Sequence, residues 1–185
     1  MTAEKTSKLY NTIVGFVPRG ATVIDVGAGM AAYHPHLLAK TRQLVLLDAY
    51  QPYLDKGPLL AHAVCGDAHE LLPAFADGQF DVALGIDFVE HLELGRAFKV
   101  IEDMQRIANT VALFVPEGSH PQSADLYGMG GDHWQTHRSS WSAGDLEHFG
   151  FTVERWPDFH ASSPGKDPGA LWCTWRRLEG SGPVP

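Results

Sequence analysis

The chain has 185 residues, 44% of them hydrophobic and 19% charged, a composition that fits one folded domain and excludes an intrinsically disordered protein. Its 22 acidic residues outnumber 14 Lys and Arg, and the formal net charge of -8 disfavours nucleic acid and anionic membranes as partners. Two distant cysteines, Cys65 and Cys173, indicate buried free thiols rather than a disulfide. Because no apolar run is long enough for a signal peptide or a membrane span, we expect a cytoplasmic protein.

Hydrophobic periodicity and turn residues divide the chain into alternating helices and strands. The predicted elements are a helix over 5–17, a strand over 22–26, a helix over 33–40, strands over 44–47 and 61–65, a helix over 69–75, a strand over 80–86, a helix over 94–108, a strand over 110–115, a helix over 142–150, and strands over 151–156 and 170–177. This alternation predicts a doubly wound α/β fold. We expect one domain over 1–178, with an N-terminal helix within 1–18, and a mobile tail over 179–185.

A glycine turn follows the first predicted strand. Gly27 and Gly29 allow the chain to reverse sharply without a Cβ that would obstruct a ligand. A helix that begins near Met30 would present free N–H groups to an anionic group. Asp48 ends the next strand, 21 residues after Gly27, where nucleotide-binding folds place the acid that accepts from ribose hydroxyls. Together these features predict an adenosine-cofactor site.

The later strand ends carry further acids, and the order of these motifs resembles the class I S-adenosylmethionine-dependent methyltransferases over residues 20–156. The residues that carry the resemblance are Asp25-x-Gly27-x-Gly29, Asp48, Gly66-Asp67-Ala68, and Phe80-Asp81-Val82 leading into Asp87-x-x-Glu90-His91-Leu92. The resemblance implies a Rossmann-like, doubly wound, mostly parallel seven-stranded sheet with an antiparallel final strand and helices on both faces. It also implies a transferase that uses S-adenosyl-L-methionine as cofactor.

The resemblance assigns roles to these residues. In this family the glycine turn lies against the methionine portion of the cofactor, and the acid after the second strand, here Asp48, binds both ribose hydroxyls. Asp67 would accept from the adenine amino group, Ala68 would offer its backbone N–H, and Asp87 would contact the methionine amino end. The expected cofactor-binding set is Asp25, Gly27, Ala28, Gly29, Asp48, Ala49, Asp67, Ala68 and Asp87. The alternative role of Asp25, Asp67 and Asp87 is helix capping or turn formation.

One departure leaves a nicotinamide-dependent oxidoreductase open as an alternative. The frequent third glycine of the family is Ala31 here, and Ala32 also fits a dinucleotide-binding fingerprint. Two features weigh against this alternative: no Tyr is followed four residues later by Lys, and no second domain is expected to carry a substrate. A non-catalytic nucleotide-binding module is the other alternative.

Residues 116–141 form a long loop, rich in aromatic residues and histidine, that would lie over the methyl donor. A hydroxyl acceptor must lose a proton as it attacks, and His133 or His137 could take it, with Asp132 or Glu90 orienting the imidazole. The expected acceptor-binding residues are His91, Tyr127, Trp134 and Trp141. These histidines could instead only pack the loop. We expect O-methylation of a small-molecule acceptor such as a metabolite or sugar, and a homodimer is compatible with this prediction.

The spacing of His133 and His137 also raises the question of a metal. With Asp132, the two histidines could hold an ion if the segment is helical. Gly130 and Gly131 directly before them disfavour a helix there, so we expect no metal at this position.

Overall fold

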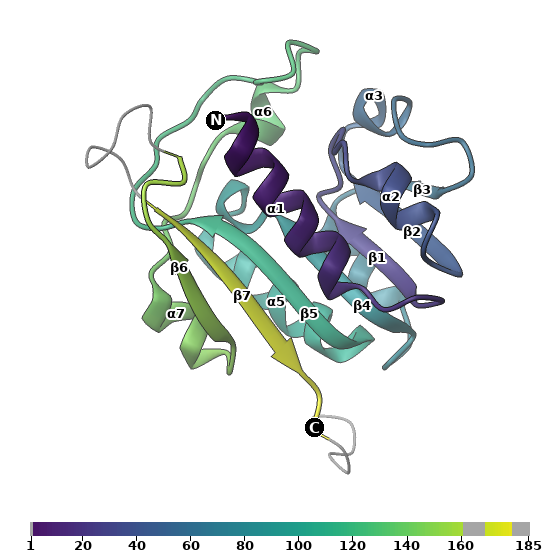
Figure 1. Ribbon diagram of the computed structural model, residues 1–185. Helices are drawn as coiled ribbons and strands as arrows, with labels where there is room; N and C mark the ends of the chain where they lie inside the picture. The colour runs from purple at the N-terminus through teal and green to yellow at the C-terminus, as the bar shows by residue number, and fades with distance from the viewer. Residues whose placement is uncertain (1, 161–168, 179–185) are drawn as a thin grey trace.

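The computed structural model describes residues 2–160 and 169–178 (Figure 1). The elements, in chain order, are α1 (Ala3–Phe16), β1 (Thr22–Val26), α2 (His34–Leu38), β2 (Gln43–Asp48), α3 (Gln51–Leu54), β3 (His62–Cys65), α4 (Ala68–Leu71), η1 (Leu72–Ala74), β4 (Phe80–Ile86), η2 (Val89–His91), α5 (Leu94–Ile107), β5 (Ala108–Pro116), α6 (Asp132–Gln135), α7 (Ala143–His148), β6 (Thr152–Trp156) and β7 (Ala170–Arg176). In this part of the chain no helix is both long and apolar enough to cross a membrane. The expected tail over 179–185 lies outside the described residues.

The strands form one seven-stranded sheet in the order β3-β2-β1-β4-β5-β7-β6. Strands β1 to β5 pair in parallel, whereas β7 runs antiparallel to both β5 and β6. The predicted doubly wound, mostly parallel sheet with an antiparallel final strand is therefore confirmed. The strand order reverses between β1 and β4, and in such sheets ligands bind beyond the carboxyl ends of the strands at this position.

Two apolar layers bury the two faces of the sheet. Figure 1 shows α1 in front of the sheet and α5 behind it. In β1 every residue is buried, because Val23 faces the layer that contains α1 whereas Ile24 and Val26 face the layer that contains α5. Burial of both faces is the physical reason why Val23, Ile24 and Val26 are all apolar.

The structure corrects three details of the sequence interpretation. The helix after the glycine turn begins at His34, close to the predicted range of 33–40 and not near Met30, because Pro35 favours the first helical turn and the residues before it form turns. Cys65 is exposed, since it lies on the edge strand β3, whereas Cys173 is buried as expected. The helical spacing of Leu94, Phe98, Ile101 and Met104 predicts that all four are buried on one face of the helix over 94–108. In α5, Ile101 and Met104 are buried, whereas Leu94 and Phe98 are 45% and 37% exposed.

Candidate functional site

Two adjoining cavities lie at the carboxyl ends of β1 to β4. The first, of about 200 Å³, is lined mainly by the ends of β2 and β3 and the start of α5. The second, of about 350 Å³, is lined by the loop after β1, by α1 and by the loop over 116–141. Four residues line both cavities: Gly27, Asp87, His91 and Gln135. One elongated ligand can therefore extend from one cavity into the other past these four residues.

The glycine turn forms the wall between the two cavities. Gly27 and Gly29 have φ angles of 70° and 53°, in the left-handed region that favours glycine. A Cβ at Gly27 would lie 2.1 Å from a ring carbon of Phe88, so no larger residue fits there without displacing that ring. The amides of Gly27 and Ala28 both donate to the carbonyl of Leu47, at 2.8 and 3.0 Å. These contacts hold the turn against the end of β2.

Asp48 connects the glycine turn to the first cavity. Its Oδ2 accepts from the amide of Gly29 at 2.9 Å and its Oδ1 from the amide of Tyr50 at 2.8 Å. The residue is only 8% exposed, and burial raises the pKa of this carboxyl. Asp48 and Ala49 line the first cavity, and a carboxylate oxygen with one hydrogen bond can still accept another.

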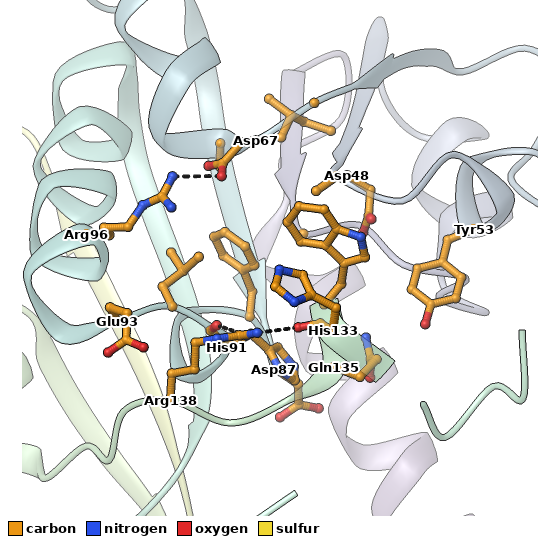
Figure 2. A pocket seen from close by; sticks show the side chains of 18 residues that line it. Asp48, Tyr53, Asp67, Asp87, His91, Glu93, Arg96, His133, Gln135 and Arg138 are labelled. Carbon is orange, nitrogen blue, oxygen red and sulfur yellow. Dashed lines mark hydrogen bonds and ion pairs between the residues drawn. The ribbon is translucent and has the colours of Figure 1, made fainter. Parts of the chain in front are cut away.

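Asp67 lies at the first cavity, just after β3, and also caps the helix that follows. Its Oδ1 caps α4 by accepting from the amide of His69 at 2.9 Å, and its Oδ2 accepts from Arg96 at 2.7 Å (Figure 2). Asp67 and Ala68 also line the cavity. The helix cap and the ion pair therefore hold the carboxylate at the cavity wall.

Asp25 does not reach either cavity. It is fully buried, and its Oδ2 accepts from the Tyr33 hydroxyl at 2.9 Å and from Nε2 of His34 at 2.8 Å. This differs from its expected place in the cofactor-binding set. Through these two hydrogen bonds the Asp25 carboxylate positions Tyr33 and His34, which follow the glycine turn. Tyr33 itself lines the second cavity, so Asp25 supports the cavity without lining it.

Asp87 follows β4 in a strained backbone conformation. Its φ of 47° is unusual for a residue other than glycine, and its amide donates to the carbonyl of Phe114 at 2.7 Å. Its Oδ1 has no hydrogen-bond partner among the described residues, and the closest cation-forming group is Nε2 of His160, 3.9 Å away. Burial raises the pKa of this carboxyl to about 7. A cationic ligand group would find an unpaired acceptor here.

Glu90, His91 and His137 form a cluster on the second cavity, which we call the Glu-His-His cluster. Their nearest ligand atoms all lie within 4.8 Å of one another, and the two imidazole ring centres are 4.8 Å apart. Glu90 is 2% exposed, and both of its carboxylate oxygens lack a hydrogen-bond partner among the described residues. Burial, together with the charge of Asp87, raises the pKa of Glu90, whereas burial lowers the pKa of His91 to about 4.

The loop over 116–141 brings His137 to this cluster. The amides of Arg138 and Ser139 donate to the carbonyl of Glu90 at 2.8 and 3.1 Å, and the Arg138 guanidinium bonds the carbonyls of His91 and His133 (Figure 2). Burial lowers the pKa of His137. Tyr127, predicted from the sequence as an acceptor-binding residue, also lines the second cavity.

The other residues expected at the acceptor lie elsewhere. His133 and Trp134 line the first cavity and not the second. Asp132 is exposed, and its Oδ1 accepts from the amide of Asp125 at 2.6 Å rather than from a histidine. Trp141 is 1% exposed in the apolar core and lines neither cavity, because its strand-like bridges to Glu117 and Gly118 turn it inward.

Sequence reasoning missed several residues of the cavities. His120 and His160 line the second cavity, and Gln135 lines both. His120 lies within the loop over 116–141, and the aromatic and histidine content of that loop could have indicated His120 as a further candidate residue. His160 follows β6, and no local pattern relates that position to the carboxyl end of β4.

The family comparison agrees with this arrangement of strand ends. Residues 24–111 match the family model described as a methyltransferase domain, and this range covers the glycine turn, Asp48, Asp67, Asp87 and the Glu90-His91 pair. The chain contains a class I S-adenosylmethionine-dependent methyltransferase domain. S-adenosylmethionine is therefore the cofactor of this methyltransferase.

Solved structures share the fold of the methyltransferase at low sequence identity. A SAM-dependent methyltransferase from Archaeoglobus fulgidus is 16% identical, with a TM-score of 0.65 over 92% of each chain. A 1,6-didemethyltoxoflavin-N1-methyltransferase from Burkholderia thailandensis, solved with 1,6-didemethyltoxoflavin and S-adenosylhomocysteine, is 18% identical, with a TM-score of 0.63 over 94% of this chain and 77% of the other. A putative zinc-dependent alcohol dehydrogenase from Rhodobacter sphaeroides is 13% identical, with a TM-score of 0.66 over 92% and 89%. No curated protein matches the sequence.

Proposed function

We propose that the methyltransferase transfers the methyl group to a hydroxyl oxygen of a small molecule bound in the second cavity. The observation that supports this proposal is the position of the Glu-His-His cluster, which lines the same cavity as the glycine turn. A hydroxyl group must lose its proton to become a nucleophile, and the cluster offers carboxylate and imidazole groups for that step. An amine or thiol acceptor that is already partly deprotonated has less need of them.

The residues around the cavities fit S-adenosylmethionine. We assign the adenosine to the first cavity, where Asp48 would bind the ribose hydroxyls and Asp67 with Ala68 the adenine. The unpaired Oδ1 of Asp87, beside the glycine turn, would accept from the ammonium of the methionine portion. When bound, the cofactor supplies a methyl group that is already electrophilic. The protein therefore has mainly to orient the acceptor, exclude water and accommodate a proton.

The second cavity suits a small acceptor. Its volume of about 350 Å³ falls within the usual range of small-molecule sites, about 300–1,000 Å³. Three tyrosines line it, and each has an apolar ring and a polar hydroxyl: Tyr10, Tyr33 and Tyr127. Such walls suit a ligand that has an apolar part and hydroxyl groups. The toxoflavin-precursor methyltransferase from Burkholderia thailandensis has a small heterocycle as its bound substrate, and that similarity supports a small acceptor here as well.

The test is to incubate the protein with methyl-labelled S-adenosylmethionine and three panels of compounds: polyols and sugars, phenols, and nitrogen heterocycles. We expect labelled ethers from the first or second panel. We also expect Glu90→Gln to lower kcat by 10-fold or more with little change in the affinity for S-adenosylhomocysteine. The matched control is His148→Ala, an exposed residue of α7 outside both cavities. Methylation confined to nitrogen heterocycles, or unchanged kcat in Glu90→Gln, would overturn the proposal, and tight NAD binding without binding of S-adenosylhomocysteine would favour the oxidoreductase alternative.

A further inference from the structure

The Glu-His-His cluster has the composition of a metal site. It offers one carboxylate and two imidazoles from η2 and from the loop over 116–141, a ligand set that suits Mn²⁺, Fe²⁺, Co²⁺ or Zn²⁺ better than Mg²⁺. The sequence spacing suggested a different possible metal site, made of Asp132, His133 and His137. Only His137 is common to that set and the Glu-His-His cluster. His91 and Glu90 are adjacent in sequence, but His137 comes to them only through the fold.

The Glu90 carboxylate requires a partner that the described residues do not provide. It is 2% exposed and neither oxygen accepts a hydrogen bond, and Nδ1 of His91 is also buried without a partner. Burying such groups unpaired costs several kcal/mol, so buried carboxylates are normally paired, protonated or bound to a metal. The neighbouring carboxylate of Asp87 adds to the negative charge at this point. A cation in the cluster would balance the negative charge of the carboxylates and give the unpaired atoms of Glu90 and His91 a partner.

The orientation of His137 leaves one nitrogen available. Its Nδ1 is hydrogen-bonded to the carbonyl oxygen of His120. Because a carbonyl can only accept, Nδ1 carries the proton and Nε2 keeps its lone pair. Metal-binding histidines are almost always fixed in this way, with the other ring nitrogen donating to a carbonyl or carboxylate.

We propose that Glu90, His91 and His137 bind one divalent transition-metal ion at the second cavity. Metal–ligand bonds of about 2.0–2.2 Å place neighbouring ligand atoms about 3 Å apart. The present spread of up to 4.8 Å therefore requires small side-chain rotations toward the centre. With three protein ligands, the ion keeps open positions toward the cavity.

The ion would also complete the proposed methyl transfer, and this part of the inference rests on the proposed function. A hydroxyl that binds at an open position becomes more acidic, as water does on a catalytic metal. With the ion bound, His137 would be a ligand and not free to take the proton, and the proton would pass instead to His120, which lines the same cavity with its ring centre 5.8 Å from that of His137. The O–H bond of the acceptor breaks, the new O–C bond forms, and the C–S bond breaks to release S-adenosylhomocysteine.

The experiment measures metal binding directly. The full-length protein is treated with EDTA, desalted and titrated with CoCl₂ while the visible absorption of bound Co²⁺ is recorded. We expect one strong site per chain in the wild type, and at least 10-fold weaker binding in Glu90→Gln and in His137→Ala. His148→Ala, which removes an exposed histidine of α7, should bind like the wild type. Circular dichroism and the Tm of each variant show whether it is folded.

Two results would overturn the metal proposal: no strong Co²⁺ binding to the folded wild type, or the same affinity in the folded variants Glu90→Gln and His137→Ala. Add-back of MnCl₂, CoCl₂ or ZnCl₂ to the EDTA-treated enzyme separates this proposal from the proposed function. Strong binding at the cluster with methylation confined to nitrogen overturns only the hydroxyl acceptor. Methylation of a hydroxyl that survives EDTA treatment, together with no strong binding, overturns only the metal.

Discussion

The Asp48 carboxylate both accepts backbone hydrogen bonds and lines the first cavity. Its hydrogen bonds from the amides of Gly29 and Tyr50 join two loops, and its remaining acceptor capacity faces the first cavity, where we propose that the ribose hydroxyls bind. We expect Asp48→Ala to weaken S-adenosylhomocysteine binding by about 1–3 kcal/mol, because hydrogen bonds to a charged group are lost. That loss corresponds to about 5- to 150-fold in Kd, measured by calorimetry.

A matched control for Asp48 is Asp55→Ala. Asp55 is an exposed aspartate a few residues further along the chain, and its carboxylate accepts from the side chain of Gln51 at 2.7 Å. We expect its affinity for S-adenosylhomocysteine to equal that of the wild type. If Asp48→Ala is folded and binds as tightly as Asp55→Ala, Asp48 does not bind the ribose.

The raised pKa of the Asp87 carboxyl predicts that the free energy of unfolding of the protein depends on pH. Its carboxyl has a pKa raised to about 7 by burial, against an ordinary value of 3.8. Between these values the folded state holds a proton that the unfolded state releases, so the free energy of unfolding falls as the pH rises through this window. His160, the nearest histidine, has a pKa lowered to about 4 by burial and is neutral through most of it. The buried Glu90 carboxyl, whose pKa is also raised, acts in the same direction.

We therefore expect Asp87→Asn to raise Tm relative to the wild type more at pH 8 than at pH 5. Asparagine cannot ionise, so the variant avoids the charge that the wild type must carry at the higher pH on a carboxylate whose Oδ1 is buried without a hydrogen-bond partner among the described residues. Thermal unfolding in buffers that contain EDTA measures this difference without a bound cation. Glu102→Gln, on the exposed side of α5, should follow the wild type at both pH values. An equal Tm difference at pH 5 and pH 8 would contradict the assignment.

Among the elements, the contact between η2 and the loop over 116–141 decides the shape of the site. Arg138 donates to the carbonyls of His91 at 2.8 Å and Thr136 at 3.0 Å, and also to that of His133. Its own amide bonds the carbonyl of Glu90. One side chain thus fixes the loop segment that lines the first cavity relative to the cluster that lines the second.

We expect Arg138→Ala to loosen this segment without unfolding the sheet. A hydrogen bond from a charged donor contributes about 1.5–3 kcal/mol to stability. Its loss should therefore lower the free energy of local opening by at least about 1.5 kcal/mol. Hydrogen–deuterium exchange at residues 133–139 should then be at least 10-fold faster, whereas the amides of β4 keep their protection. The control Arg19→Ala removes an exposed arginine between α1 and β1. Unchanged exchange at 133–139 would show that backbone bonds alone hold the loop.

The short elements of the chain were the hardest to predict from sequence. α3 and α6 have four residues each and lie in stretches interpreted as connections. Such short helices depend on tertiary contacts rather than on periodicity. The long elements were predicted well, since β4 begins at Phe80 and ends at Ile86 as expected. The four-residue strand β3 (His62–Cys65) was nevertheless expected at 61–65, so length alone did not decide which elements could be predicted.

At the scale of the whole molecule, the strand ends that form the first cavity could be predicted, whereas the second cavity could be predicted only in part: His91, Tyr127 and His137 line it, but His133 and Trp134 do not. Asp48, Asp67 and Asp87 each follow a parallel strand, and parallel strands bring such residues to one edge of the sheet. His137 meets Glu90 through main-chain hydrogen bonds across a long loop, which no periodic pattern encodes. Trp141 shows the same limit, because its sequence neighbours suggested the cavity and its bridges to residues 117 and 118 place it in the core.

The two cavities together imply that cofactor binding should stabilise a defined part of the molecule. A ligand that spans them contacts the ends of β1, β2 and β4 and the loop over 116–141, but not α7. At 100 times its Kd, S-adenosylhomocysteine should raise the free energy of unfolding by about 2.7 kcal/mol, or Tm by about 5–10 °C for a chain of this size. Exchange should slow at residues 27–33, 48–53, 87–93 and 120–137 and stay constant in 143–148. The same concentration of NAD is the control, and equal protection by NAD, or protection confined to the first cavity, would contradict a single site that spans both.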